Sequence, residues 1–389
     1  MEKSIIDRIF DSKLSSYERF ASDTPTLLTL QELAILTHKW DINGNMSEEP
    51  SPFMKDLFTF IEKVPFPAPE NPTFTFIDLF AGIGGFRIAL QNLGGKCIFS
   101  SEFDIDAQKT YFNNYGEIPF GDITLPQVKA LIPEHFDVLC AGFPCQAFSV
   151  AGYRKGFEDT RGTLFFDVAT IIREHRPKAF FLENVKNLKS HDNGKTFSII
   201  KGTLEELGYV VFDAILNTME YANIPQNRER IFIVGFDPLQ VENWKEFQFP
   251  QKVELNVSIN NLIDYTINDP ALFYRENVPF FHLLQEGMTN PNTVYQWRRQ
   301  YVRENQSNVC PTLTANMGTG GHNVPLIVTP DGFRKLSPRE CLNFQGYPQL
   351  FDFPDIANSK RYKQVGNSVT VPLIQRIGQQ IINILQPNF

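Results

Sequence analysis

Residues 76–85 read Phe76-Ile-Asp-Leu-Phe-Ala-Gly-Ile-Gly-Gly85, an apolar run that ends in a glycine-rich turn. Helical spacing follows from about Phe86, so the stretch predicts a buried strand, a tight loop and a helix. The amide groups of such a loop face a bound ligand at the start of the helix. Because Arg87 stands where the dinucleotide fingerprint needs a third glycine, the loop disfavours NAD, FAD and a nicotinamide dehydrogenase.

The alternation of strands and helices continues along the chain. Apolar runs that predict strands lie at 97–101, 136–141, 179–182, 210–216 and 230–236, and helical spacing lies at 107–115, 164–174, 196–207 and 371–385. This pattern predicts an α/β fold with a Rossmann-like, mostly parallel sheet that is covered by helices on both faces. From 237 to 333 the sequence is irregular and rich in Asn and Pro, which predicts a smaller domain inserted before the C-terminal helix.

The first 72 residues form a separate segment. Helical spacing at 16–21 and 27–40 precedes a proline-rich stretch, 65–72, that is typical of a linker. A packing extension is the favoured interpretation, and a helix-turn-helix DNA reader is the alternative. The predicted units are therefore 1–72, 73–236, 237–333 and a C-terminal segment, 334–389, that returns to the first sheet.

Composition limits the classes of protein. The 389 residues carry a formal net charge of -8, which argues against an acidic partner, but basic residues cluster at 154–155, 228–230, 298–303, 334–339 and 360–363. Five cysteines without a CxxC pair argue against a disulfide framework and against a metal site. No signal peptide and no long apolar run is visible, so we expect a cytoplasmic protein without a membrane anchor.

Two acidic residues follow the glycine loop at successive strand ends. Glu102 lies about 20 residues beyond the glycines, where a carboxylate accepts hydrogen bonds from ribose hydroxyls. Asp122 comes after the next helix and is placed to accept a hydrogen bond from an adenine amino group. Together with a loop that lacks a pyrophosphate signal, these acids predict S-adenosylmethionine as the cofactor.

Cys145 is the candidate nucleophile. The stretch Gly142-Phe-Pro-Cys-Gln-Ala-Phe-Ser149 follows the predicted strand 136–141, and ligands of open α/β sheets bind at the carboxyl ends of strands. A buried, inert cysteine is the alternative, and it suits Cys97, Cys140 and Cys341 better.

Glu183 emerges at the end of the strand 179–182, at the same edge of the sheet as Cys145. A helix-capping or salt-bridged acid is the alternative interpretation. A thiolate beside an acid favours addition of sulfur to C6 of a cytosine ring while the acid engages N3. C5 then attacks the methyl group of the cofactor, a base removes the C5 proton and the thiolate leaves.

Seven stretches of the chain, in order, resemble the bacterial cytosine-5 DNA methyltransferases of restriction-modification systems, and the resemblance covers about residues 74–385. The stretches are 76–85, 142–149, 161–166, 183–187, 226–230, 335–340 and 364–369. The resemblance implies a monomer that flips cytosine out of double-stranded DNA, with 73–236 as the catalytic and cofactor-binding domain and 237–333 as the target-recognition domain. It also implies a restriction endonuclease as functional partner, without a stable complex.

The resemblance implies roles for three groups of residues. The catalytic group is Cys145 as nucleophile, Glu183 on N3 and the exocyclic amine, Arg230 orienting the base, and Arg228, Pro144 and Asn184 beside them. The cofactor group is Phe80, Gly82, Gly84, Glu102, Phe103, Asp122, Ile123, Leu164, Asn367 and Ser368. Phe103 stands where many members carry tryptophan, so an aromatic face for the adenine is retained.

DNA contacts are implied in two places. One is a mobile loop, 146–162, that closes over DNA, with Gln146, Ser149, Arg154, Lys155 and Arg161. The other is the target-recognition domain, with Arg298, Arg299, Thr312 and Leu313. The arginines fit guanine edges and phosphates equally well.

Two alternatives stay open at this point. A tRNA cytosine-5 methyltransferase has a similar catalytic domain, although the large inserted domain favours duplex DNA. The segment 1–72 also fits a DNA-binding repressor, but it has no dense basic face. The target sequence does not follow from spacing, and the catalytic half resembles members that modify CC-N-GG or CC-W-GG sites.

Overall fold

The computed structural model describes residues 4–11, 52–144, 164–319 and 323–386. Its centre is a six-stranded sheet in the order β2-β1-β3-β4-β7-β5. The strands are β1 (Phe74–Leu79), β2 (Gly95–Ser101), β3 (Val138–Gly142), β4 (Ala179–Val185), β5 (Val210–Asn217) and β7 (Glu229–Phe236). The first four strands in this order pair in parallel, and β7 is antiparallel to both neighbours. The predicted α/β fold with a mostly parallel sheet is confirmed.

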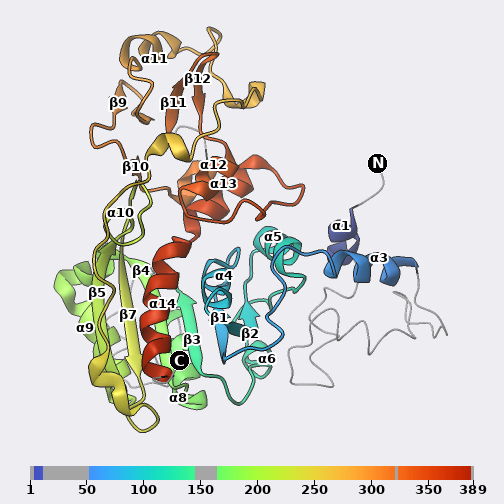
Figure 1. The fold of residues 1–389 in the computed structure, drawn as a ribbon, viewed down its shortest axis with the longest axis vertical. Coiled ribbons are helices and arrows are strands. Elements are labelled where there is room, and N and C mark those ends of the chain that lie inside the picture. The colour runs from blue at the N-terminus through green and yellow to red at the C-terminus, as the bar shows by residue number, and fades with distance from the viewer. Residues whose placement is uncertain (1–3, 12–51, 145–163, 320–322, 387–389) are drawn as a thin grey trace.

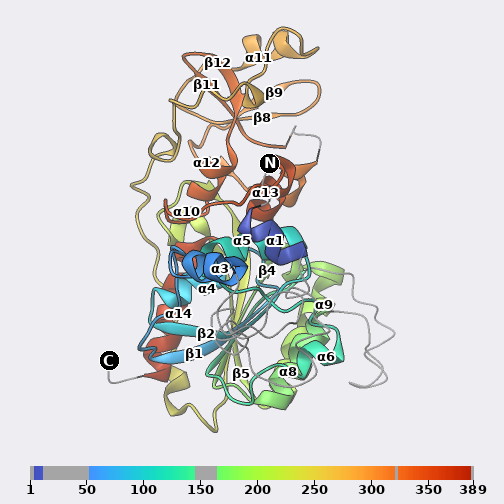
Figure 2. The ribbon, with the colours of Figure 1, turned by 90° about the vertical axis from the view of Figure 1, so that its right-hand side faces the viewer.

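Helices cover both faces of this sheet (Figures 1 and 2). The helices α4 (Gly85–Gln91) and α14 (Val371–Leu385) lie on one face, and α6 (Pro126–Lys129), α8 (Leu164–His175) and α9 (Lys195–Glu206) lie on the other. Side chains alternate between the two cores, because Phe76 packs on the side of α4 whereas Ile77 and Leu79 pack on the side of α8. Strands buried on both faces explain the continuous apolar runs in the sequence.

Shorter elements lie between the strands and helices of the large sheet and lead toward the rest of the molecule. These are α5 (Ile105–Tyr115), η3 (Lys186–Lys189), η4 (His191–Gly194), α10 (Thr218–Tyr221), β6 (Gln226–Asn227), α12 (Pro338–Asn343) and α13 (Asn358–Asn367). A capping box between Ser337 and Glu340 starts α12, and Glu340 also pairs with the buried Arg334 at 2.7 Å. This region joins the large sheet to a smaller one.

The smaller sheet is antiparallel and lies at the far end of the molecule from the C-terminus of α14 (Figure 1). Its order is β12-β11-β8-β9, from β8 (Tyr295–Trp297), β9 (Val302–Glu304), β11 (Leu326–Thr329) and β12 (Gly332–Lys335), beside α11 (Phe281–Gly287). Four 3-10 helices lie in the described segments around these strands: η5 (Glu242–Glu246), which packs on α14, η6 (Ile259–Asn261), η7 (Pro270–Leu272) and η8 (Ala315–Gly318), which packs on α13. Val241 and Phe247 still pack in the large core, so the chain leaves that core well after residue 237.

One short two-stranded sheet ties the chain to the residues before β7, between β9 and β11 of the small sheet. The strand β10 (Cys310–Pro311) pairs in parallel with β6, opposite Gln226 and Asn227. The residues that follow, Thr312 and Leu313, therefore lie beside the loop that leads into β7.

The described part of the N-terminal segment packs on α5. The helices α1 (Ile5–Asp11) and α3 (Pro52–Ile61) bury Ile6, Ile9 and Leu57 against Phe112. The sequence predicted neither α1 nor α3, and the predicted helices at 16–21 and 27–40 lie outside the described residues. The proline-rich stretch is anchored, since the Phe66 N–H donates to the Asn114 carbonyl at 3.1 Å. Within the described residues, no helix is long and apolar enough to cross a membrane.

Candidate active site

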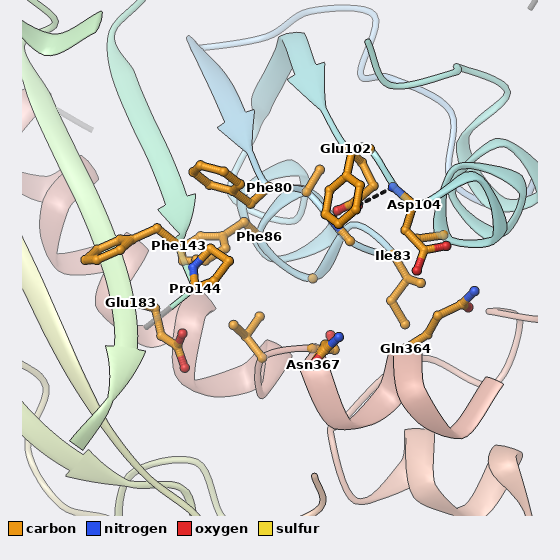
Figure 3. A pocket seen from close by; sticks show the side chains of 18 of the residues that line it. Phe80, Ile83, Phe86, Glu102, Asp104, Phe143, Pro144, Glu183, Gln364 and Asn367 are labelled. Carbon is orange, nitrogen blue, oxygen red and sulfur yellow. Dashed lines mark hydrogen bonds between the residues drawn. The ribbon is translucent and has the colours of Figure 1, made fainter. Parts of the chain in front are cut away.

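The carboxyl ends of β1, β2, β3 and β4 open into a cavity of about 620 Å³, which α13 closes from the other side. Figure 3 shows Glu102 and Asp104 on one side of it, Pro144 and Glu183 on the other, and Asn367 between them. The structure brings these predicted residues to its lining: Phe80, Gly82, Glu102, Phe103, Asp122, Ile123, Pro144, Leu164, Glu183, Asn184, Arg228, Arg230, Asn367 and Ser368. Residues predicted as a cofactor set and a catalytic set thus share one cavity.

The glycine loop has a backbone that few residues adopt. Phe80 has φ 57°, a strained value for a bulky residue, and Gly82 has φ 56°. A Cβ atom at Gly82 would meet nothing within 4 Å, so the loop leaves space above its backbone. This open cradle faces the cavity.

Glu102 joins the glycine loop to the start of α5. Its Oε2 accepts a hydrogen bond from the Gly82 N–H at 2.8 Å, and its Oε1 accepts one from the Asp104 N–H at 2.8 Å. Burial raises the pKa of the Glu102 carboxyl above its ordinary value, while these two N–H groups lower it. Each oxygen keeps a lone pair, so the carboxylate can still accept from ribose hydroxyls.

Gly84 does not line the cavity, although it was predicted as a cofactor residue. It has φ 83°, and a Cβ atom there would lie 2.4 Å from the Tyr115 ring. Glycine is therefore required for the turn into α4 and for its packing on α5. Arg87, one turn later, points inward and forms a bidentate ion pair with Glu117 at 2.5 and 2.7 Å.

The rim near Glu102 is aromatic and charged. Phe103 is 70% exposed, so its ring face is free for stacking. Asp122 is exposed and accepts the Thr124 N–H at 2.9 Å, which fixes the turn that presents its carboxylate. Lys363 pairs with Asp104 at 2.8 Å across this rim. Lys363 belongs to the basic cluster 360–363, but its place at the cavity was not predicted from the sequence, because only the docking of α13 on α5 brings it there.

At the other end of the cavity Glu183 forms an ion pair with Arg230. Their Oε1 and Nε atoms are 3.0 Å apart, and the two residues come from the paired strands β4 and β7. Glu183 is thus a salt-bridged acid, as one interpretation of the sequence held, but it is also part of the cavity wall. The fixed guanidinium aims the carboxylate toward the space between Pro144 and Asn367 (Figure 3).

Asn184 shapes the turn that leads to the predicted nucleophile. Its side-chain N–H donates to the Phe143 carbonyl at 2.8 Å, and its oxygen accepts the Val185 N–H at 2.8 Å. Pro144 lines the cavity, and Cys145 is the next residue in the sequence. Asn184 therefore holds the backbone two residues before Cys145.

Several predicted residues lie outside the described residues and are not placed: Cys145, Gln146, Ser149, Arg154, Lys155 and Arg161. The other four cysteines, Cys97, Cys140, Cys310 and Cys341, are buried, as predicted for three of them. Burial raises the pKa of the Cys97 thiol to about 12, so this group is not a nucleophile at neutral pH.

The predicted DNA residues fall into different environments. Arg298 and Arg299 follow β8 in the small sheet and are exposed. Thr312 donates its hydroxyl to the Asn227 carbonyl at 2.6 Å, whereas Leu313 is 1% exposed. The Leu313 side chain belongs to the core and is not free to contact DNA, because β10 draws it against the β6 loop. Arg228 lines the cavity, but its guanidinium is bonded to backbone carbonyls.

A glycine loop after β1, an acid after β2 and a sheet with one antiparallel strand define an α/β enzyme of the methyltransferase class. Residues 74–383 match the family described as C-5 cytosine-specific DNA methylase, and the chain belongs to this family. It is 50% identical over 308 residues to the type II methyltransferase M.Bsp6I of Bacillus sp. (strain RFL6), covering 78% of this chain and 96% of that relative.

Further relatives agree with this assignment. The chain is 47% identical over 328 residues to the type II methyltransferase M.HpaII of Haemophilus parainfluenzae, covering 80% of this chain and 90% of the relative. The crystal structure of the S. pombe Dnmt2 methyltransferase matches with a TM-score of 0.61 at 18% identity, covering 81% of this chain and all of that one, 100%. That likeness shows the fold. The protein is a cytosine-5-specific DNA methyltransferase.

Proposed function

We propose that the chain methylates C5 of a target cytosine in double-stranded DNA with S-adenosylmethionine, as the modification enzyme of a restriction-modification pair. The observation that carries the proposal is that the glycine loop with Glu102 and the Glu183–Arg230 ion pair line the same cavity. The type II methyltransferases among the relatives support a partner restriction endonuclease, which needs to share only the DNA target with this chain.

The residues of the cavity fit S-adenosylmethionine. A volume of about 620 Å³ lies in the range of small-molecule sites, and the open face of Gly82 lets a ligand approach the backbone. Glu102 would hold the ribose hydroxyls, Phe103 the adenine face and Asp122 the adenine amino group. The remaining predicted cofactor residues, Phe80, Ile123, Leu164, Asn367 and Ser368, would form the walls. The bound cofactor supplies the methyl group.

We assign the nucleophile to Cys145. The four other cysteines are buried and none of them lines the cavity, so only Cys145, next to Pro144, is left for this role. Its thiolate would add to C6 of cytosine while Glu183 holds N3 and the amino group. Electron density then moves to C5, which takes the methyl group. A base removes the C5 proton and the C6–S bond breaks, which restores the ring and the thiolate.

The buried position of Glu183 supports a flipped base. Glu183 is 8% exposed and lies on the wall of the cavity, where a base stacked in a duplex cannot reach it. The target cytosine must therefore leave the helix. Arg230, held 3.0 Å from Glu183, would orient the extruded base. Gln146, Ser149, Arg154, Lys155 and Arg161 stay a prediction as the loop that closes over DNA.

We propose residues 237–333 as the target-recognition region. The exposed Arg298 and Arg299 at the end of β8 are its candidates for DNA contact, and Thr312 supports the region from β6. The described N-terminal helices pack on α5, which supports a structural extension over a repressor. A monomer, with 73–236 and 334–389 forming the catalytic unit, suffices because one chain carries both ends of the cavity.

The test uses duplex DNA in which 5-fluorocytosine replaces cytosine. Fluorine at C5 cannot leave as a proton does, so the wild type should become covalently attached to DNA in the presence of cofactor. Cys145→Ala should not, while Cys341→Ala, which changes a buried thiol, should still be trapped. Covalent attachment of this DNA to the Cys145→Ala variant would show that Cys145 is not the nucleophile.

A tritiated methyl group on the cofactor separates the substrates. Label in DNA as 5-methylcytosine supports the proposal, and label only in tRNA would favour the alternative enzyme. Bisulfite mapping of DNA from expressing cells then reads the target, and a CC-N-GG or CC-W-GG site is the expectation.

A further inference from the structure

Arg228 is a buried cation held by carbonyl groups. It is 2% exposed, its Nη1 donates to the Leu313 carbonyl at 2.7 Å, and its Nη2 donates to the carbonyls of Ser368 at 2.5 Å and Gly366 at 3.4 Å. Among the described residues no carboxylate lies within ion-pairing distance of this guanidinium. Gly366 belongs to the last turn of α13, so the charge also lies at the negative end of that helix.

The peptide of Leu313 is held from both sides. Its carbonyl accepts from Arg228, and its N–H donates to the side-chain oxygen of Gln226 at 3.1 Å. Gln226 in turn donates to the Phe344 carbonyl at 2.7 Å. The segment that arrives from the small sheet is therefore fixed to the loop between β6 and β7.

The other contacts of Arg228 lie on the cavity wall. Gly366 and Ser368 flank Asn367, and all three line the cavity. The Ser368 hydroxyl is 2.6 Å from the Tyr347 hydroxyl, which fixes this turn from behind. One side chain thus joins the recognition side of the molecule to the wall on which the cofactor is proposed to bind.

Buried N–H donors keep these parts together. A buried guanidinium N–H that loses its acceptor is left without water to replace it, so Leu313 and the turn 366–368 are constrained to move as one. Burial and the charge of Arg230 lower the pKa of Arg228 to about 9, which leaves the guanidinium charged at pH 7.

We propose that Arg228 is a positioning residue that couples DNA binding to cofactor affinity. DNA that shifts the segment 312–313 moves the guanidinium, and the guanidinium moves the turn 366–368 against the cofactor. This inference rests on the proposed function, since it takes duplex DNA and S-adenosylmethionine as the two ligands.

The test measures a ratio of affinities. The Kd of S-adenosylhomocysteine is determined by calorimetry at pH 7 for the protein alone and for the protein saturated with a duplex that carries the mapped target. We expect the two values to differ by about fivefold or more in the wild type, the usual range for coupled sites. In Arg228→Lys and Arg228→Gln the ratio should fall to about one, because neither side chain can reach all three carbonyls.

Arg339→Gln is the matched control. Arg339 also donates to three carbonyls, those of Tyr347, Pro348 and Phe351, but these belong to one local segment and Arg339 does not line the cavity. This variant should keep the wild-type ratio. A purely structural role of Arg228 would weaken both Kd values equally and leave the ratio unchanged.

Two results would overturn the inference: a ratio of one in the wild type, or a wild-type ratio in folded Arg228 variants. If the variants do not fold, hydrogen exchange of the wild type decides, because target duplex alone should slow exchange in residues 364–370. Unchanged exchange there overturns it as well. Failure of the proposed function is distinct, since it would appear as no methylation of any duplex by the wild type.

Discussion

Asp78 carries a carboxyl that the structure buries without a hydrogen-bond partner. It lies on β1 opposite Ser100 and Cys140, is fully buried, and neither of its oxygens has a partner among the described residues. Burial raises the pKa of Asp78 from 3.8 to about 8, although the charge of Arg87 lowers it. The folded protein therefore keeps a proton at neutral pH that the unfolded chain releases.

The sign of the pH effect follows from this proton. Between pH 3.8 and about 8 the folded state binds more protons than the unfolded state, so the Asp78 contribution to stability decreases as pH rises. The decrease is about 1.4 kcal/mol per pH unit within that window. Asn at position 78 has no titratable proton. The stability of Asp78→Asn relative to the wild type should therefore rise by about 3 kcal/mol between pH 5.5 and 7.5.

The assay is urea unfolding of both proteins at the two pH values. Any constant cost of the amide group cancels, because only the change of the difference with pH is used. Asp355→Asn serves as control, since it makes the same chemical change at an exposed carboxylate. Equal differences for Asp78→Asn at pH 5.5 and 7.5 would refute the burial argument.

Three further predictions concern activity and packing. Glu183→Gln should leave the Kd of S-adenosylhomocysteine unchanged but lower turnover by about 10²-fold or more, because the acid acts on the target cytosine. Turnover is measured with tritiated cofactor, and a large loss of affinity for S-adenosylhomocysteine would assign Glu183 to cofactor binding instead. Gly84→Ala should lower the free energy of unfolding by about 1–3 kcal/mol in urea titrations, since its Cβ would lie 2.4 Å from the Tyr115 ring and φ is 83°; wild-type stability would contradict that close contact. Arg299→Ala should reduce the salt slope of DNA binding by about one if the side chain contacts phosphate, or relax the target at one base pair if it reads guanine, whereas no change in either would exclude a DNA contact.

The order and type of most elements of the large sheet could be predicted from the sequence. A strand buried on both faces is a continuous apolar run, and a helix such as α14 repeats its apolar residues every three to four positions, so both signals are local. Because ligand sites of such sheets lie at strand ends, Glu102 and Glu183 could also be located. The helices α1 and α3 were missed, because the first 72 residues were interpreted only through the helical spacing at 16–21 and 27–40 and the proline-rich stretch at 65–72.

What the sequence by itself determined was the fold class, the glycine loop and the acids at the strand ends, because short stretches of neighbouring residues encode them. Only the tertiary structure decided that β7 enters antiparallel between β4 and β5, which brings Arg230 to Glu183. The tertiary structure also decided that the Leu313 side chain is buried in the core. It alone placed the Arg228 guanidinium against backbone carbonyls that lie 85 or more residues further along the chain. The direction of a side chain and the pairing of distant segments depend on which segments bury apolar surface against each other. A local sequence pattern does not say which distant segment will be the partner.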